Sequence, residues 1–531
     1  MVFFKKNLDK IITGIAFGIF LLVTCYGLTA SSLWYDEAIE YWYSKIMFGE
    51  LPMTGVADGT TNMYQRIIIT FQPPLYNIIM FFWLKISDGE LWFRFFGVLM
   101  GFVGMIGLYK TIKKMANSYI AATAVICSST IYTLYSYWQE CAEYCLVLAS
   151  LFWTIYFWIC LLQEINLRHI ITFTIFCIIS VYSQYGAIFP VFAMILSAYL
   201  YILSKKQRKD IVQISLTYLI ALVFAAIPLY VFFIKKQMLK RQADGFAAIT
   251  IPHFDEGILH DFYDGLLTTF RWNFFSYIYS DAKVQYTLIV ILILGLISLI
   301  LGKNKLIKII IFTNIICWIC YYIAVKFGIY SGAFGVRHNL FFTPMWIVLI
   351  CAVLVDIFSM LAALSLPHIH PNILKALKWG FFTVCMAAVC YFTIFNWTGK
   401  LIEHSYKSDV RGPVNEWYTQ KAYEKPTIVY YAADPGFAYY VRQNENYNEH
   451  TEDHVTYMDW LQNLSVDEYS SLVDSFYGQS WPQDVYIVAA NFIDDLDVLA
   501  ECFTQKGYTR EDLYDIHYGK LIYLSKNGSD K

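Results

Sequence analysis

Long apolar segments constrain this chain more than any other feature of its sequence. A helix needs about 20 apolar residues to cross a bilayer. About eleven segments are long enough, and they begin near Ile11, Leu91, Tyr119, Leu146, Ile170, Ala187, Ile211, Gln285, Leu306, Leu340 and Ala376. Because 58% of the residues are hydrophobic and only 15% are charged, the chain is not an ordinary soluble protein. The sequence predicts an all-α polytopic membrane bundle of about 11 spans, within a range of roughly 10 to 13.

The basic residues of the connecting loops fall mainly on one side of this bundle. Cytoplasmic loops of membrane proteins carry an excess of lysine and arginine. With a cytoplasmic N-terminus, the inner loops contain Lys110, Lys113, Lys114, Arg168, Lys205, Lys206, Arg208, Lys209, Lys303, Lys305, Lys308, Lys375 and Lys378. Lys235, Lys236, Lys240 and Arg241 fall outside and are an exception. The pattern predicts a multi-pass plasma-membrane protein with a cytoplasmic N-terminus.

This topology leaves two large outer loops, at residues 34–90 and 235–284. The first loop contains an apolar run at residues 72–86. If this run crossed the membrane, Lys110 and its neighbours would fall outside, against the charge bias. We therefore expect residues 72–86 to form a helix that lies in the outer interface.

The last part of the chain differs in composition from the rest. Residues 398–531 contain 11 Lys or Arg and 22 Asp or Glu, whereas residues 1–397 contain 28 basic and 19 acidic residues. β-rich runs at 427–432, 484–490 and 520–525 alternate with helical patterns, which is typical of an α/β fold. The sequence predicts a transmembrane domain at 1–397 and a small acidic extracytoplasmic α/β domain at 398–531.

Polar side chains near the hydrocarbon are costly, so they are candidates for function. Asp36 and Glu37 follow the first span, although an acidic pair also suits a plain helix start because it complements the helix dipole. Glu140 lies between two spans among tyrosines, which an aromatic interfacial belt would also explain. Gln184 and Tyr185 interrupt a very apolar stretch, where a tight turn is the alternative.

Two adjacent basic residues complete the set of candidates on the outer side. Arg337, followed by His338, directly precedes a span. A guanidinium there suits a bidentate phosphate contact better than a lysine would, and an interfacial anchor is the alternative. The chain has no Gly-rich nucleotide-binding pattern, so we expect neither ATP nor a nucleotide sugar to take part, and no nucleic-acid partner.

Six motifs resemble those of the GT-C type membrane glycosyltransferases. The similarity is to the bacterial relatives of dolichyl-phosphate-mannose protein mannosyltransferases and of the lipid A aminoarabinose transferase. The motifs are Leu33–Ala38, Gln72–Tyr76, Glu90–Arg94, Tyr137–Glu140, Tyr182–Tyr185 and Arg337–Leu340. The first three occur in the family's order and spacing.

The resemblance implies a GT-C fold and a transferase that takes a monosaccharide from a polyprenyl-phosphate donor. The sugar would pass, generally with inversion, to a glycan, lipid or protein acceptor on the outer face. Asp36 would be the catalytic base or a carboxylate that positions the acceptor, with Glu37 beside it. Arg337 with the 235–284 loop would help to hold the lipid phosphate. A divalent cation held by Asp36 and Glu140 is an optional addition. The further substrate-binding positions would be Gln72, Arg94, Glu140, Gln184, Tyr185 and His338.

Three positions depart from the family pattern. Gln72 replaces a basic residue, Gln184 replaces a histidine, and Ala142 stands in place of an arginine. These changes indicate a divergent substrate or reduced activity. Another cation would then have to serve, and the candidates are Arg66, Arg94, Arg271 and His338.

Other functions fit the same sequence. A lipid flippase is one, although transporters tend to carry internal repeats and polar sites at the midplane, and this chain shows neither. A polymerase or ligase of lipid-linked glycans would use similar loops with a longer donor. Gln72 and Gln184 also make a catalytically inactive relative in an envelope assembly conceivable.

Overall fold

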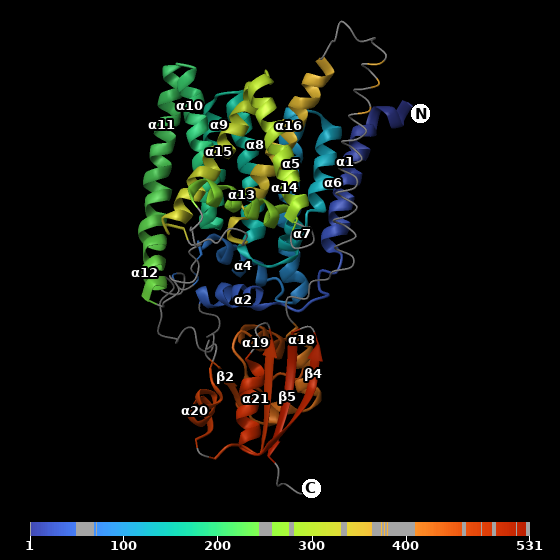
Figure 1. Cartoon of the computed structure of the whole chain (residues 1–531), viewed down its shortest axis with the longest axis vertical. Coiled ribbons are helices and arrows are strands. Elements are labelled where there is room, and N and C mark those ends of the chain that lie inside the picture. Colours follow the sequence, from blue (N-terminus) through green and yellow to red (C-terminus); the bar gives the residue numbers. More distant parts are fainter. Residues whose placement is uncertain are drawn as a thin grey trace. The chain divides into compact units, whose positions relative to one another are not determined.

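The chain forms two compact units in the computed structural model (Figure 1). The first unit comprises Met1–Tyr26, Ile67–Tyr76 and Arg94–Glu403, and the second comprises Gly27–Arg66, Asn77–Phe93 and His404–Lys531. The second unit thus joins the segment after the first helix to the C-terminal part of the chain. The structure describes residues 2–48, 68, 70, 72–243, 257–275, 281–330, 337–363, 373, 376, 380, 409–458, 464–478, 480–490, 495–516 and 518–526.

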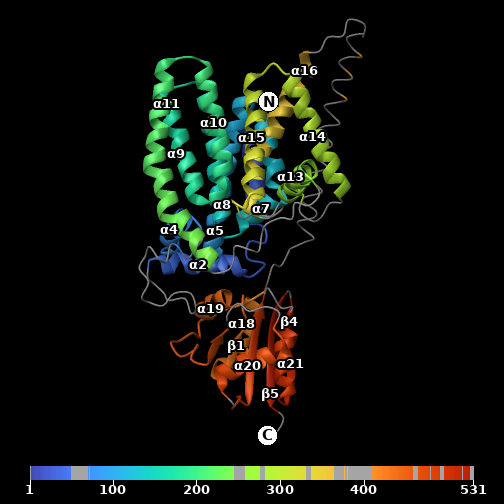
Figure 2. The same ribbon diagram turned by 60° about the vertical axis from the view of Figure 1, so that its left-hand side comes forward.

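The first unit is a bundle of long apolar helices, which Figures 1 and 2 show from two directions. Its described helices are α1 (Val2–Cys25), α5 (Glu90–Met115, with its first turn in the second unit), α6 (Ser118–Ser129), α7 (Tyr132–Gln139), α8 (Glu143–Gln163), α9 (Leu167–Ser183), α10 (Ile188–Ser204), α11 (Arg208–Ala221), α12 (Lys235–Ala243), α13 (Ile258–Phe274), α14 (Asp281–Leu301), α15 (Lys305–Lys326) and α16 (Phe342–Ala363).

Eight helices in the described part of the chain are long and apolar enough to cross a membrane. The prediction of a multi-pass membrane bundle is confirmed. α6 and α9, also predicted as spans, are shorter apolar helices of 12 and 17 residues. The span predicted near Ala376 lies outside the described residues, apart from single positions. The eight helices cover Asn7–Cys25, Glu90–Met115, Glu143–Gln163, Tyr185–Ser204, Arg208–Leu239, Ala282–Leu301, Lys305–Lys326 and Phe342–Ala363.

Glycines on α5 allow close packing against α7 and α8. A Cβ atom at Gly97 would lie 2.6 Å from the Trp138 carbonyl oxygen, and one at Gly101 would lie 2.7 Å from the Trp138 ring. At Gly104 a Cβ atom would lie 3.1 Å from Cα of Ala149. Small residues bring helix backbones together in membranes, where the hydrophobic effect does not drive helix association. These contacts fix α5 against the segment that carries Glu140.

The second unit contains a five-stranded mixed sheet, which Figure 2 shows together with its helices. The strand order is β2-β1-β3-β5-β4, in which β1 is parallel to β2 and β3, and β5 is antiparallel to β3 and β4. The predicted α/β domain is confirmed. Its elements are α18 (Arg411–Thr419), β1 (Thr427–Val429), α19 (Asp434–Gln443), β2 (Val455–Tyr457), α20 (Val466–Tyr477), β3 (Asp484–Ala490), α21 (Leu496–Gln505), β4 (Tyr508–Ile516) and β5 (Gly519–Lys526).

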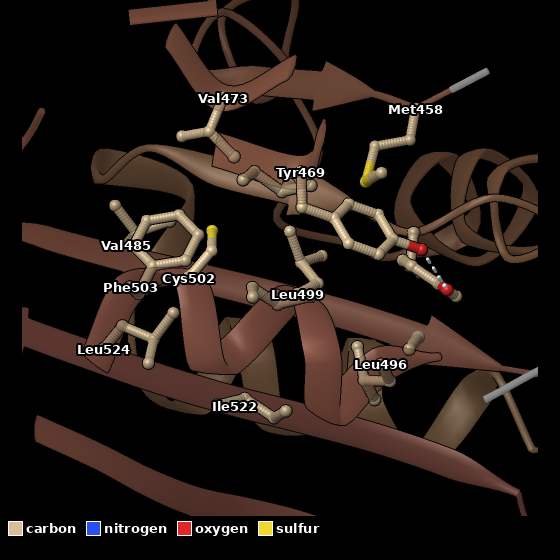
Figure 3. Packing of buried hydrophobic residues seen from close by; sticks show 14 of the residues in the cluster. Met458, Tyr469, Val473, Val485, Leu496, Leu499, Cys502, Phe503, Ile522 and Leu524 are labelled. Carbon is tan, nitrogen blue, oxygen red and sulfur yellow. Dashed lines mark hydrogen bonds between the residues drawn. The ribbon is translucent and has the colours of Figure 1, made fainter. Parts of the chain in front are cut away.

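One face of this sheet packs against α20 and α21. Figure 3 shows Tyr469, Leu499, Phe503 and Ile522 directed into a common core. The Tyr469 hydroxyl lies 3.0 Å from that of Tyr430, so the buried phenols satisfy each other. Side chains of this size each contribute roughly 1.5–3 kcal/mol when fully buried.

Two helices of the first outer loop are also described. α2 (Tyr35–Met47) lies in the second unit, and α4 (Leu75–Leu84) begins in the first unit and continues in the second. α4 falls within the run at 72–86 where a helix is predicted. The 235–284 loop contains α12, the start of α14 and α13, and α13 is a helix that the sequence reasoning did not anticipate.

We expect Gly97→Ala to destabilise the protein by about 1–3 kcal/mol, because the added methyl group meets a backbone carbonyl that cannot move aside. Thermal unfolding in detergent measures the effect. Gly295→Ala in α14 is the matched control, since a Cβ atom there has nothing within 4 Å. Equal unfolding temperatures for the two variants would contradict this account of the packing.

Candidate active site

Asp36 and Glu37 lie in the first turn of α2. Trp34 has an extended backbone and precedes the helix, and its N–H donates to Oε2 of Glu37 at 3.3 Å. Glu37 is 2% exposed, whereas Asp36 is partly buried. Glu37 therefore caps the helix, as the plain helix-start interpretation expects. A catalytic role for either carboxylate stays a prediction.

A third carboxylate of the second unit lies near Asp36. Asp434 begins α19, the helix that follows the parallel strand β1, and burial raises its pKa to about 7. The Tyr35 phenol has a pKa raised well above its usual value, mainly by burial and further by Asp434 and Asp36. Both carboxylates thus act on one phenol. In open α/β sheets, ligands bind outside the carboxyl ends of parallel strands, which is where Asp434 lies. Sequence reasoning missed Asp434, although an aspartate directly after a β-rich run was a usable signal.

In the first unit, a chain of hydrogen bonds joins two predicted site positions. The Tyr185 hydroxyl donates to Oε1 of Gln237 at 2.6 Å, and Nε2 of Gln237 donates to the Gln72 carbonyl at 3.0 Å. Gln237 is 3% exposed and lies near the end of the 32-residue helix Arg208–Leu239. Sequence reasoning did not single out Gln237, because nothing local distinguishes it from the polar residues around it.

Gln184 is a buried amide at the end of α9. Its side chain is 2% exposed, and within the described residues neither its oxygen nor its nitrogen has a hydrogen-bond partner. A buried polar group without a partner costs about 1–3 kcal/mol, so native proteins keep few of them. The amide can therefore both donate to and accept from a polar ligand.

The turn that carries Arg337 and His338 lies beside the Gln184–Tyr185 turn. The Tyr330 hydroxyl donates to the His338 carbonyl at 3.0 Å. A Cβ atom at Gly186 would lie 2.7 Å from that same hydroxyl, so only glycine allows this approach without a shift. The structure thus brings two motifs together that lie about 150 residues apart in the sequence.

α13 also contacts the segment that carries Arg337. Nδ2 of Asn273 donates to Oδ1 of Asn339 at 3.3 Å, and the Thr343 hydroxyl donates to Oδ1 of Asn273. Both asparagines are buried. The described part of the 235–284 loop therefore contacts the Arg337 turn. The loop and Arg337 are predicted to hold the lipid phosphate together.

Glu140 and Arg94 complete this end of the first unit. Both are buried, at 5% and 3% exposure. A Cβ atom at Gly97, one helical turn after Arg94, would lie 3.3 Å from the Glu140 carbonyl oxygen. Just beyond Glu140, Ala142 and Tyr144 pack against Leu340, next to the Arg337 turn. Buried charges are costly unless compensated, which makes both residues candidates for function.

The predicted site residues of the first unit share one end of its helices. They occur near the starts of α5, α8, α10 and α16 and at the end of α9. The lysines at the end of α5 and those between α14 and α15 occur at the opposite helix ends. Lys235 and Lys236 lie beside Gln237 at the site end and are exposed, so they remain the exception to the charge bias. Which end faces outward stays a prediction.

Asp36 belongs to the second unit, and Arg337 and Glu140 belong to the first. The convergence of Asp36 with Arg337, and a cation held between Asp36 and Glu140, stay predictions. Across the described ranges, no group of three or more His, Cys, Asp or Glu side chains is arranged to hold a metal ion. Of the other cation candidates, Arg66 lies outside the described residues, and Arg271 lies on α13.

Comparison with known proteins gives one family match and several matches to solved structures. Residues 71–234 match the model of the family described as dolichyl-phosphate-mannose-protein mannosyltransferase. The fold matches the crystal structure of ArnT from Cupriavidus metallidurans in the apo state, with a TM-score of 0.55 and 11% identity over 98% of both chains. The predicted GT-C resemblance is confirmed.

The likeness in fold extends over nearly the whole chain. ArnT bound to undecaprenyl phosphate matches with a TM-score of 0.54 and 11% identity, over 97% of this chain and 98% of that one. The apo oligosaccharyltransferase of Archaeoglobus fulgidus matches with a TM-score of 0.50 and 12% identity, over 96% of this chain and 74% of that one. A comparison with curated protein sequences finds no match.

The family match covers most of the GT-C site predicted in the first unit. It includes Gln72, Arg94, Glu140, Gln184 and Tyr185. It does not reach the Asp36 helix or the Arg337 turn, which are linked to the family by their motifs alone.

We expect Asp434→Asn to stabilise the protein at pH 8 by about 1–4 kcal/mol and to have little effect at pH 4. The pKa of Asp434 is raised to about 7, whereas an unfolded aspartate titrates near 3.9. The folded state therefore binds more protons between these values, and wild-type stability falls as the pH rises through that window. Thermal unfolding of the full chain at both pH values measures the difference.

Asp467→Asn provides the control for this pair of measurements. Asp467 occupies an exposed first-turn position of α20, so its replacement also removes one charge at a helix N-terminus. If both variants shift the unfolding temperature equally at the two pH values, the burial account of Asp434 is wrong.

Proposed function

We propose that this protein transfers a monosaccharide from a polyprenyl-phosphate donor to an acceptor on the outer face of the membrane. The observation that carries the proposal is the family match over residues 71–234, which contains most of the polar residues gathered at one end of the helical unit. The likeness in fold to ArnT, which has been crystallised with undecaprenyl phosphate, supports the choice of donor.

The reaction is a direct displacement at the anomeric carbon. A base removes the proton of the acceptor hydroxyl, and the oxygen attacks the sugar while the bond to the lipid phosphate breaks. Asp36 acts as the base, and the configuration inverts. The leaving phosphate gains charge in the transition state, which a preorganised cation stabilises.

Arg337 is the cation proposed for this phosphate. Its guanidinium has the planar fork that matches a phosphate, and its turn is braced by Tyr330 and by Asn273 of α13. Because Gln72 is neutral, Arg94 and His338 supply further positive charge. Arg94 lies one helical turn before the glycine that packs on the Glu140 segment.

The neutral amide of Gln184 serves recognition and not charge neutralisation. It is buried and can donate and accept at once, which suits a hydroxyl group of the sugar or the acceptor. Tyr185 and Gln237 hold the adjacent turn through their short hydrogen bond. Gln184 in place of a histidine would leave a donor contact that does not change with pH between 5 and 8.

We expect Asp36→Asn to lower the rate of sugar transfer by about 10²–10⁴-fold, because the variant lacks the general base. The assay gives the purified protein radiolabelled polyprenyl-phosphate mannose, glucose or galactose and measures label leaving the lipid. Asp453→Asn, an exposed change in the C-terminal domain, should keep the wild-type rate. Unchanged turnover in Asp36→Asn would remove this residue from the mechanism.

The proposed orientation has its own test. We expect a protease site inserted at residue 450, in the exposed turn after α19, to be cut in intact cells or spheroplasts. A site inserted after Lys205, at the opposite helix ends from the site residues, should be cut only after the membrane is opened. Cleavage in the reverse order would place the site end in the cytoplasm.

A further inference from the structure

A hydroxyl group of the C-terminal domain contacts the segment that leads into the Asp36 helix. The Leu33 N–H donates to the Tyr440 hydroxyl at 2.7 Å, and that hydroxyl donates to Oε2 of Glu90 at 2.9 Å. Leu33 and Tyr440 are both buried. A phenol that accepts one hydrogen bond and donates another fixes the backbone only three residues before Asp36.

Arg411 of α18 reinforces this contact. Its Nη2 atom donates to the Thr29 carbonyl at 3.0 Å, and its Nη1 atom lies 3.5 Å from Oε2 of Glu90. Its guanidinium carbon lies 5.9 Å from the centre of the Tyr440 ring. Glu90 thus receives both the tyrosine hydroxyl and the guanidinium, a charge-assisted arrangement that is stronger than neutral hydrogen bonds.

The body of α2 packs on α19 as well. Nε1 of Trp42 donates to the Pro435 carbonyl at 2.9 Å, and the Tyr41 and Tyr439 rings lie 4.8 Å apart in an edge-on contact. α2 therefore packs on α19 through Tyr41 and Trp42, while Tyr440 and Arg411 contact the chain just before it. A shift of Asp36 along the helix axis would break several of these contacts at once.

We propose that Tyr440 is a positioning residue for Asp36, acting through Leu33 and Glu90. This inference rests on the proposed function, in which Asp36 is the catalytic base. A misplacement of about 1 Å in a catalytic group costs up to 100-fold in rate. The C-terminal domain on this view is part of the catalytic apparatus, because it sets where the carboxylate points.

Tyr440→Phe tests the proposal with little change in packing, since the ring that lies beside Tyr439 and Arg411 remains. We expect kcat for sugar transfer to fall about tenfold while KM for the lipid donor stays unchanged. In an Asp36→Glu background, where the carboxylate is already displaced, the same change should cost clearly less than tenfold.

Tyr418→Phe is the matched control. Its hydroxyl donates to the Val441 carbonyl at 3.0 Å, within the C-terminal domain and away from residues 29–33. This variant should keep the wild-type kcat. An equal loss of kcat in both variants, or an equal loss with and without Asp36→Glu, would show a general effect on stability and overturn the proposal.

Backbone hydrogen exchange separates this inference from the proposed function. We expect the peptide that contains residues 29–36 to exchange about tenfold faster in Tyr440→Phe than in the wild type, and at the wild-type rate in Tyr418→Phe. Unchanged exchange in Tyr440→Phe would overturn the positioning role. If the wild type moved no sugar from any donor, the proposed function would fail. Faster exchange in Tyr440→Phe would still support the inference that Tyr440 restrains residues 29–36.

Discussion

The bilayer imposes the constraint on which the rest of this structure depends. Inside the hydrocarbon every backbone polar group must be satisfied within the chain, so the apolar segments become helices. Polar side chains are then tolerated at helix ends or where the protein buries them. Arg94, Glu140, Gln184 and Arg337 all lie at helix ends on one side of the bundle. The predicted site thus lies where a helical membrane protein can keep polar groups.

The second unit contributes Asp36, which the helix ends of the first unit do not supply. Asp36 lies on a short helix after the first span, and this helix is docked on α19 of a domain whose sheet begins almost 400 residues later in the chain. The contacts are specific and buried, and they involve both backbone and side chains. A loop of this kind would otherwise be mobile, since loops have few buried apolar contacts of their own. Asp434 comes from the same domain and acts on the same Tyr35 phenol as Asp36.

Sequence reasoning predicted the parts that depend on local pattern. The apolar runs predicted the membrane helices, and the alternation of β-rich and helical segments predicted the C-terminal sheet. It missed α13, because a helix of 17 residues with charged positions falls below the length that marks a span. It missed Gln237 and Tyr440 because their roles arise from partners far away in the sequence. The lysines beside Gln237 lie in the last turns of a helix of 32 residues, which is more than the roughly 20 residues needed to cross the hydrocarbon, so they can lie beyond it.

The central claim is that Asp36 and Arg337 act on one phosphate-linked sugar. An experimental structure of the protein with a polyprenyl phosphate bound tests this most directly. The account predicts the lipid phosphate within hydrogen-bond distance of the Arg337 guanidinium, with the Asp36 carboxylate facing the side of the phosphate where the sugar is attached. A phosphate bound elsewhere, or Asp36 remote from Arg337, would contradict it.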